Sequence, residues 1–342
     1  MSVFPRLAPD RREALLAEPT GPVDVVIDTD VTNEVDDQLA IVWALLRGDR
    51  LRLHGLYACP YGWDGPRRLG GGLTSALGQR RLRARMAQQG LSAADLPVLD
   101  PAEGHRRALE ELHRIVDVAG APTDLALGGV PGYLPGPAEP VECPAVDHLI
   151  ELSHAERDGP LYVLAIGGAT NVASALLTDP TLVERIVVVW TSAYPSFWPE
   201  PNASFNLAQD LHASRVLLDS GVPLVYLPGY YVGEQLRTTF EEVRAHMSGK
   251  GPLGDYLVEV CARHSMSDGP PGTSKVMWDL INVAWVLEPE WLVTKLVATP
   301  GLGPDLRWQA RPDAPLMREA VDIDRDAVFV DLYARLAAAA IS

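Results

Sequence analysis

Residues 23–46 read VDVVIDTDVTNEVDDQLAIVWALL, and this stretch decides the fold class of the chain. Its opening, residues 23–28, is rich in β-branched apolar residues, which predicts a buried strand. Residues 38–46 are a second apolar run that stops before Gly48 and predicts a buried helix. The next apolar stretch, residues 51–59, completes a strand–helix–strand unit. Such a unit is typical of a parallel sheet that carries helices on its faces.

The same alternation of strands and helices continues along the chain. Further strands are predicted at residues 161–166, 186–190 and 222–227. Further helices are predicted at about residues 171–177 and 211–220. Residues 60–104, rich in Gly, Arg and Gln, predict a loop-and-helix excursion rather than a second domain. Residues 1–342, with a lead-in at 1–20, are therefore predicted to form one α/β domain with an open, mainly parallel β-sheet flanked by helices. In such sheets, ligands bind beyond the carboxyl ends of the strands.

Composition excludes several classes of protein. The formal charge of −16, from 29 basic and 45 acidic residues, argues against a nonspecific binder of nucleic acid. Cys59, Cys143 and Cys261 lack the spacing of a zinc site or a disulfide framework and are expected to be buried thiols. Residues 1–20 carry charges and prolines where a signal peptide is apolar, and no apolar run reaches the length of about eighteen residues that a membrane helix needs. We therefore expect a soluble cytoplasmic protein with no membrane partner.

Five carboxylates fall within ten residues at the end of the first predicted strand: Asp28, Asp30, Glu34, Asp36 and Asp37. Capping of the following helix by Asp36, helped by the helix dipole, would account for one or two of them but not for all five. Carboxylates at this density repel one another, and hard oxygen ligands are what Ca²⁺ or Mg²⁺ requires. The cluster therefore predicts a metal site.

Four segments in order carry a family resemblance: DTDVTNEVDDQLA (28–40), LAIGGATNVASAL (164–176), FNLAQD (205–210) and KVMWDLINVAWVLEP (275–289). Together they resemble the motifs of the inosine-uridine-preferring nucleoside hydrolase family, in which a DxD is followed shortly by DD and a helix. The resemblance spans about residues 23 to 290. The loop inside the first motif is longer here than in the best-known members.

The resemblance implies calcium-dependent hydrolysis of the N-glycosidic bond of a small-molecule ribonucleoside or related ribosyl compound. It implies a Ca²⁺ ion held by Asp30, Asp37, the main-chain oxygen of Ile166 and Asp279, with Asp30 as the general base toward a metal-bound water. A cation at such a site lowers the pKa of a water and offsets the charge of the carboxylates. A helix N-cap is the alternative role for Asp279. The resemblance also implies a homo-oligomer, either a dimer or a tetramer.

For the substrate, the resemblance implies that Asp36 and Asn206 bind the ribose 2′ and 3′ hydroxyls. Carboxylates accept from hydroxyl donors, and an amide both donates and accepts; a turn residue before the next helix is the alternative for Asn206. Asn202 is placed near the family's upstream sugar-binding asparagine, although its spacing is not the usual one. Asn171 is expected to hold the turn at its helix start rather than to touch substrate. Asn33 falls, with Glu34, in the lengthened loop beside the site.

Two departures from the family pattern leave the base and sugar open. Ser204 stands where the family has a glutamate that grips the 5′ hydroxyl, and Trp278 stands where well-known members have a histidine that helps to protonate the leaving base. Indole donates a hydrogen bond but does not shuttle a proton near neutral pH. Stacking on a substrate ring and packing in the core are both open roles for Trp278. Pro60 occupies the place of an asparagine often found after the second strand.

Two other functions compete with this interpretation. VVIDTDVT also fits the DxDxT strand of haloacid-dehalogenase-type phosphatases, with Asp28 as nucleophile and Asp30 as acid/base. That scheme wants its metal-binding acidic pair late in the chain, and it leaves GGATN and FNLAQD unexplained. The other alternative is a noncatalytic ribosyl-ligand binder with a degenerate site. Retention of Asp30, Asp36, Asp37 and Asp279 argues against full decay.

Overall fold

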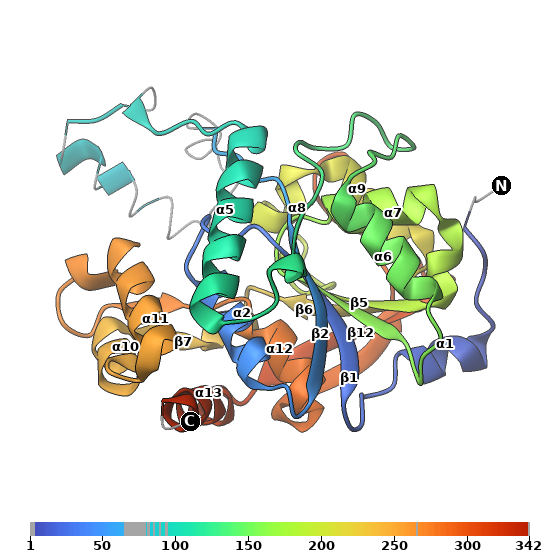
Figure 1. Ribbon diagram of the computed structural model, residues 1–342. Coiled ribbons are helices and arrows are strands. Elements are labelled where there is room, and N and C mark those ends of the chain that lie inside the picture. The colour runs from blue at the N-terminus through green and yellow to red at the C-terminus, as the bar shows by residue number, and fades with distance from the viewer. Residues whose placement is uncertain are drawn as a thin grey trace.

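The computed structural model describes residues 4–64, 80, 83, 84, 86–88, 90–92, 95–264 and 266–340. Its centre is an eight-stranded sheet in the order β3-β2-β1-β4-β5-β6-β12-β9 (Figure 1). The strands of this sheet are β1 (Val23–Thr29), β2 (Leu51–Ala58), β3 (Ala126–Gly128), β4 (Leu161–Ala165), β5 (Ile186–Ser192), β6 (Leu224–Pro228), β9 (Leu292–Ala298) and β12 (Leu316–Ile323). Neighbouring strands pair in parallel except β9, which runs antiparallel to β12. The prediction of an open, mainly parallel sheet is confirmed.

Two short antiparallel ribbons lie outside the central sheet. They pair β7 (Arg237–Thr239) with β8 (Ser274–Val276), and β10 (Gly301–Leu302) with β11 (Trp308–Gln309). Within the described residues, the α-helices with defined bounds are α1 (Pro9–Leu15), α2 (Asp36–Leu46), α5 (Pro101–Ala119), α6 (Pro144–His154), α7 (Thr170–Thr178), α8 (Phe205–Gln209), α9 (Leu211–Ser220), α10 (Phe240–Met247), α11 (Gly251–Arg263), α12 (Leu280–Leu287) and α13 (Arg325–Ala339).

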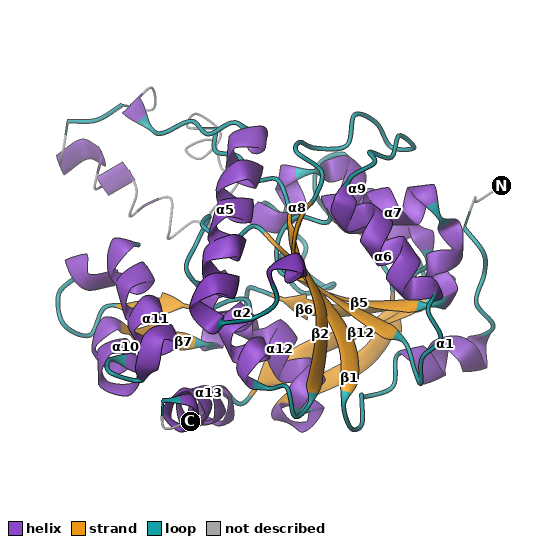
Figure 2. Cartoon of the chain, in the orientation of Figure 1, coloured by secondary structure: helices purple, strands orange, loops and turns teal. Residues whose placement is uncertain are grey.

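Helices cover both faces of the sheet and enclose two hydrophobic cores (Figure 2). Apolar side chains of α2, α5, α11, α12 and α13 fill one core, and those of α6, α7 and α9 fill the other. Strand β1 contributes Val25 and Ile27 to the first core and Val26 to the second, because successive side chains of a strand point to opposite faces. Burial on both faces explains why the three consecutive residues 25–27 of β1 are all apolar.

The elements predicted from the sequence are present, with small shifts at their ends. Helix α9 has the bounds that were predicted, whereas α2 begins at Asp36, two residues before the predicted start. Acidic side chains suit the first turn of a helix, which explains the longer α2. Strand β6 begins at Leu224 rather than at 222, because Pro223 has no amide hydrogen to donate to a ladder. Part of the predicted excursion at 60–104, mainly residues 65–79, lies outside the described residues.

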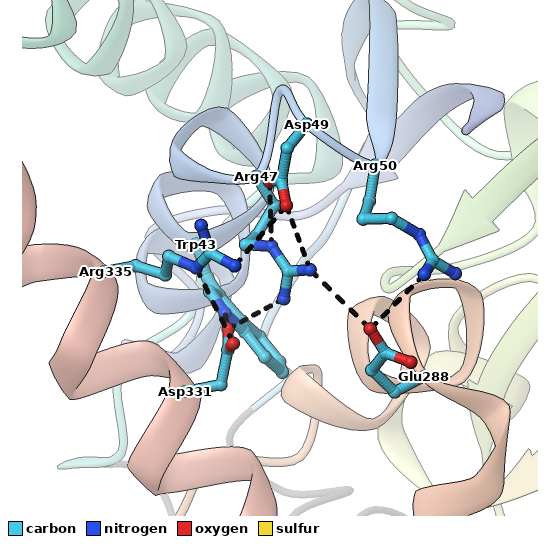
Figure 3. Close-up of polar contacts among 7 residues, drawn as sticks. All are labelled: Trp43, Arg47, Asp49, Arg50, Glu288, Asp331 and Arg335. Atoms are coloured by element: carbon cyan, nitrogen blue, oxygen red, sulfur yellow. Dashed lines mark hydrogen bonds and ion pairs between the residues drawn. The ribbon is translucent and has the colours of Figure 1, made fainter. Parts of the chain in front are cut away.

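An ion-pair network fixes the carboxyl end of α2 (Figure 3). The buried guanidinium of Arg47 contacts Asp49 at 3.0 Å and, on α13, Asp331 at 2.9 Å. The indole of Trp43 donates to the same Asp331 carboxylate at 2.8 Å. The network also reaches Glu288, just after α12, at 3.7 Å from Arg47. Because the other end of α2 carries Asp36 and Asp37, this network anchors the helix that presents them.

The carboxyl ends of four parallel strands meet at one edge of the sheet. Asp28 is in register with Ala165, Ala165 with Trp190, and Ser192 with Pro228. The residues that follow β1, β4, β5 and β6 are therefore brought together there, as expected for a ligand site in such a sheet. No helix in the described part of the chain is long and apolar enough to cross a membrane.

Candidate active site

A cavity of about 300 Å³ opens at this edge of the sheet. Its acidic lining consists of Asp30, Glu34, Asp36, Asp37, Glu234 and Asp279. Its aromatic, amide, hydroxyl and basic lining includes Asn33, Ser204, Asn206, Tyr230, Arg237 and Trp278. The structure thus brings together the acidic residues of β1–α2 and Asp279, which lies far along the chain, at the start of α12.

Three of these carboxylates form a compact group. Asp36, Asp37 and Asp279 are buried, and each offers an oxygen within 4.8 Å of the others. Asp30 is not part of this close group, but it lines the same cavity and is only 3% exposed. Its charge acts on both Asp37 and Asp279 and raises the pKa of each.

Helix capping does not occupy these carboxylates. The N-cap of α2 is Val35, and Asp279, although it is the N-cap residue of α12, makes no side-chain capping bond. Oδ2 of Asp36 accepts the backbone N–H of Trp278 at 2.9 Å, while its Oδ1 is buried without a hydrogen-bond partner among the described residues. An orphaned carboxylate oxygen in a buried site is costly, and it marks a place where a ligand or cation is missing.

Burial and mutual repulsion destabilise the ionised form of the group. Desolvation, followed by the charge of Asp36, raises the pKa of Asp30 to about 8. Desolvation, followed by the charge of Glu34, raises the pKa of Asp36 to about 8, although the nearby ammonium of Lys275 acts in the opposite direction. The pKa of Asp279 is raised well above its ordinary value for the same reasons. A set of repelling, oxygen-only donors fits a hard divalent cation, whose charge would offset the repulsion.

Asn206 and Ile166 meet at the cavity. The side-chain amide of Asn206, in the short helix α8, donates to the carbonyl of Ile166 at 2.9 Å and to the carbonyl of Thr191 at 3.2 Å. A carbonyl oxygen has two lone pairs, so this bond leaves the Ile166 oxygen able to bind a second partner. Both residues line the cavity, as the sequence predicted.

Asn202 is not among the residues that line the cavity. Its side chain accepts from the backbone N–H of Tyr194 at 3.2 Å and donates to the carbonyl of Leu306 at 3.2 Å. These bonds join the loop after β5 to the turn between β10 and β11. The structure therefore gives the Asn202 amide a place in loop packing, away from the predicted contact with sugar.

Both departures from the family pattern face the cavity. Oγ of Ser204 accepts from the backbone N–H of Ala193 at 2.9 Å and lies 3.1 Å from Oγ of Ser192. The Trp278 ring lines the cavity and meets Tyr230 edge to face, with ring centroids 5.5 Å apart. Its partial exposure there favours contact with a ligand over burial in the core.

The lengthened loop also reaches the site. The Asn33 amide donates to Oδ2 of Asp30 at 3.1 Å and accepts from the indole of Trp63 at 3.0 Å. Glu34 forms an ion pair with Lys275. Lys275 belongs to the same KVMWD segment as Asp279.

Asn171 and Asp28 are bonded to each other outside the cavity. The Asn171 amide donates to Oδ1 of Asp28 at 2.7 Å and accepts from the backbone N–H of Val130 at 2.7 Å. Asn171 therefore ties strand ends together instead of holding the turn at its own helix start, as was predicted, and it is not among the residues that line the cavity. Asp28 is fully buried and is not a lining residue, so its position does not suit the nucleophile of the phosphatase scheme.

Sequence reasoning missed Tyr230 and Arg237 in the cavity lining. Tyr230 follows the carboxyl end of β6, and this position was the signal that could have found it. Arg237 begins β7, which lies outside the central sheet. This strand has three residues, too few for the alternation of apolar and polar residues that predicts a strand.

Fold and cavity together define an α/β protein whose site, at the carboxyl edge of a parallel sheet, combines buried carboxylates with amide and aromatic groups. Residues 25–330 match the model of the family described as "Inosine-uridine preferring nucleoside hydrolase", and the chain belongs to this family. It is an N-glycosyl hydrolase of the nucleoside hydrolase type, and hydrolysis of ribonucleosides is the reaction of the family. This membership replaces the phosphatase alternative.

Individual relatives agree with this assignment. The pyrimidine-specific ribonucleoside hydrolase RihA of Enterobacter sp. is 29% identical over 264 residues, which cover 71% of this chain and 80% of the relative. Among solved structures, an inosine-guanosine nucleoside hydrolase has a TM-score of 0.65 and 17% identity, covering 92% of this chain and 98% of that one. The purine-preferring ribonucleoside hydrolase of Gardnerella vaginalis has a TM-score of 0.60 and 18% identity, covering 93% and 100%. At these identities, the two solved structures show the shared fold.

Proposed function

We propose that this chain is a calcium-dependent enzyme that hydrolyses the N-glycosidic bond of a ribonucleoside or related ribosyl compound, with Asp30 as the general base. The observation that carries the proposal is the buried group of Asp36, Asp37 and Asp279 at the carboxyl edge of the sheet, with Asp30 in the same cavity. A protein that only binds a ribosyl compound would not need one of its metal-binding carboxylates, Asp30, to act as a base.

The residues that would hold the ion are Asp30, Asp37, Asp279 and the carbonyl of Ile166. Several carboxylates with one main-chain carbonyl are a ligand set typical of Ca²⁺, whereas Mg²⁺ prefers fewer protein ligands and more waters. When bound, a divalent cation lowers the pKa of a water and offsets the negative charge around it. Its charge would also keep the four buried aspartates ionised at neutral pH.

Asp36 and Asn206 would bind the sugar. Oδ1 of Asp36 is a buried acceptor without a partner among the described residues, and the ribose 2′ and 3′ hydroxyls are donors of the matching kind. Because Oδ2 of Asp36 is held by the backbone of Trp278, the free oxygen has a defined direction. Oδ1 of Asn206 would accept from the same diol, because the amide nitrogen already donates to the carbonyls of Ile166 and Thr191. Asn202, whose side chain is used by loop backbone, would support the site from outside.

Asp30 and Trp278 would have different parts in the reaction. Asp30 would accept the proton of the attacking water, and Asn33 would hold Oδ2 of Asp30 in place. Trp278 would stack against the leaving base and donate a hydrogen bond, but it cannot deliver a proton. The proposed enzyme therefore favours ribosyl compounds whose leaving group departs without full protonation.

The test measures free base and ribose released from purine nucleosides, pyrimidine nucleosides and 4-nitrophenyl riboside, with added Ca²⁺ and after chelation. We expect release that depends on the metal, and a loss of about two or more orders of magnitude in kcat for Asp30→Asn with metal still bound. Asp219→Asn, an exposed aspartate on α9, serves as the matched control. Near-full turnover by Asp30→Asn would remove Asp30 as the base, and tight nucleoside binding without product would support the noncatalytic binder.

We also propose that the enzyme is a homo-oligomer, a dimer or a tetramer. Light scattering at micromolar concentration measures this directly, and a monomer under those conditions would overturn it.

A further inference from the structure

A second hollow, of about 600 Å³, lies at the opposite edge of the sheet from the candidate active site. It is bordered by α1, by the end of α6 and by the segments that lead into β4 and β5. Its lining includes the arginines Arg6, Arg11, Arg157 and Arg185, and these four define what we call the basic hollow. Since Arg157 and Arg185 precede β4 and β5, the basic hollow lies at the amino ends of the strands. None of its lining residues lines the active-site cavity.

The arginines of the basic hollow have no ionic partners among the described residues. Elsewhere in the fold, many arginines contact a carboxylate, as Arg47, Arg307 and Arg325 do. In the basic hollow, the single bond that Arg11 makes is to a backbone carbonyl, that of Glu184, at 3.4 Å. The chain has a formal charge of −16, so carboxylates are abundant. Four cations gathered in one hollow, none of them in an ion pair within the described part of the chain, are therefore a specific feature of this surface.

Arg157 carries the strongest sign of a missing partner. Its Nε atom is buried and has no hydrogen-bond partner in the described part of the chain, while its far end donates to the carbonyl of Leu152. The charge of Asp24 acts on Arg157, but the Asp24 oxygens are already held by Arg52 at 2.8 Å and by His54 at 2.6 Å. A buried donor without an acceptor is costly, and because Arg157 lines the hollow, an anion bound there would stabilise the charge of its guanidinium.

The remaining lining leaves the hollow with an excess of positive charge. Glu156 and Glu184 contribute two carboxylates against the four guanidinium groups. His154, also in the lining, is held by Asp179 at 2.6 Å and is not free to serve a ligand. Guanidinium groups match the oxygens of phosphate in geometry and in charge, often with two parallel bonds. The volume exceeds that of a single inorganic ion and falls within the range of small-molecule sites.

We propose that the basic hollow binds a small, water-soluble phosphorylated anion through Arg6, Arg11, Arg157 and Arg185. Such a ligand joins the lead-in and α1 to the loops before β4 and β5, which come from distant parts of the sequence. Figure 1 shows α1 on the same side of the molecule as α6 and α7, where the ligand would hold it. The site is separate from the chemistry at the other edge of the sheet and does not depend on the proposed hydrolysis.

Isothermal titration calorimetry with glycerol 3-phosphate, inorganic phosphate and sulfate tests the proposal, at an ionic strength kept constant with sodium chloride. We expect one saturable site per chain that prefers the phosphates, with affinity at least about tenfold weaker in Arg157→Gln and in Arg185→Glu, since each removes a charged donor. The matched control is Arg244→Gln, because Arg244 is an exposed arginine of α10, outside the hollow. Its affinity should equal that of the unmodified chain.

Hydrogen exchange provides a second readout. We expect phosphate to slow amide exchange in residues 9–16, and this protection should disappear in Arg185→Glu. If Arg157→Gln does not fold, Arg185→Glu alone decides, because Arg185 is exposed and replaceable. Three results would each overturn the proposal: no saturable binding, the same affinity in Arg185→Glu as in the unmodified chain, or the same loss of affinity in Arg244→Gln as in Arg185→Glu.

Discussion

The Trp278 ring lies next to the metal-binding candidate Asp279 and faces the cavity, so its chemistry limits the leaving group. A histidine at this position would have an ordinary pKa near 6.5 and could donate a proton. We expect Trp278→His to raise kcat for purine nucleosides about tenfold or more, and to change kcat for 4-nitrophenyl riboside much less. Steady-state kinetics on both substrates measures the ratio. Trp278→Phe, which keeps a ring but no acid, is the control, and an equal gain on both substrates would contradict the argument.

Glu319 acts on the cavity from a distance. This fully buried residue of β12 accepts the backbone N–H of Ser196 at 2.6 Å and its hydroxyl at 2.9 Å. The loop that contains Ser196 places Tyr194 in a stack with the cavity residue Tyr230, with centroids 4.1 Å apart. Glu319 is therefore a positioning residue for the stacked rings of Tyr194 and Tyr230.

We expect Glu319→Ala to lower the free energy of unfolding by about 1–3 kcal/mol, because it removes the buried acceptor of two donors of the partly buried Ser196. For hydrolysis, we expect KM to rise several-fold with little change in kcat, since Tyr230 would contact the substrate in the proposed function without touching the reacting atoms. Urea denaturation and steady-state kinetics give the two values. Lys295→Ala removes only the exposed partner of Glu319, at 3.4 Å, and should change stability by less than about 1 kcal/mol. A drop in kcat with unchanged KM would argue against the positioning role.

At the scale of elements, the contacts of Arg47 determine how firmly α2 presents Asp36 and Asp37. The Arg47 side chain is 3% exposed and bonds to Asp331 of α13, which is itself only 18% exposed. We expect Arg47→Met to lower the free energy of unfolding by about 3 kcal/mol, because a largely buried carboxylate then loses its partner. Arg335→Met removes a more exposed arginine from the same network and should cost less than about 1 kcal/mol. Urea denaturation compares the two, and equal costs would show that burial of the network contributes nothing.

At the scale of the whole molecule, the acidic cavity links stability to pH and to metal. Without metal, Asp30 and Asp36 have pKa values raised to about 8, so between their ordinary pKa and pH 8 the folded chain holds protons that the unfolded chain releases. The metal-free fold therefore loses stability as pH rises through this range. The range from pH 7 to pH 8 reports on the carboxylates rather than on histidines. Burial lowers the pKa of histidines such as His105, so these side chains titrate at a lower pH.

We expect chelation to lower Tm, and the difference between calcium-loaded and chelated protein to be larger at pH 8 than at pH 7. The ion binds the ionised carboxylates and removes their repulsion, so its contribution grows as protons leave. Differential scanning calorimetry at both pH values measures it. In Asp279→Asn the difference should shrink at both pH values, and a chelated protein as stable as the loaded one at pH 8 would contradict the metal site.

The sequence by itself determined the features that depend on neighbouring residues. The alternation of apolar runs gave the strand–helix units and a parallel sheet, because periodicity and turn chemistry act over a few residues. The run from Asp28 to Asp37 gave an acidic site at the end of a strand for the same reason.

Only the tertiary structure decided which distant groups meet. The family resemblance implied that Asp279 lies with Asp30 and Asp37, whereas the structure put Asp36 in the close group with Asp37 and Asp279 and left Asp30 outside it. The structure also used the Asn202 amide for the backbone of Leu306. It also decided the strand order and the gathering of four arginines at the opposite edge of the sheet. These outcomes depend on how the whole sheet and its two cores pack, and contacts between segments hundreds of residues apart leave no periodic signal in the chain.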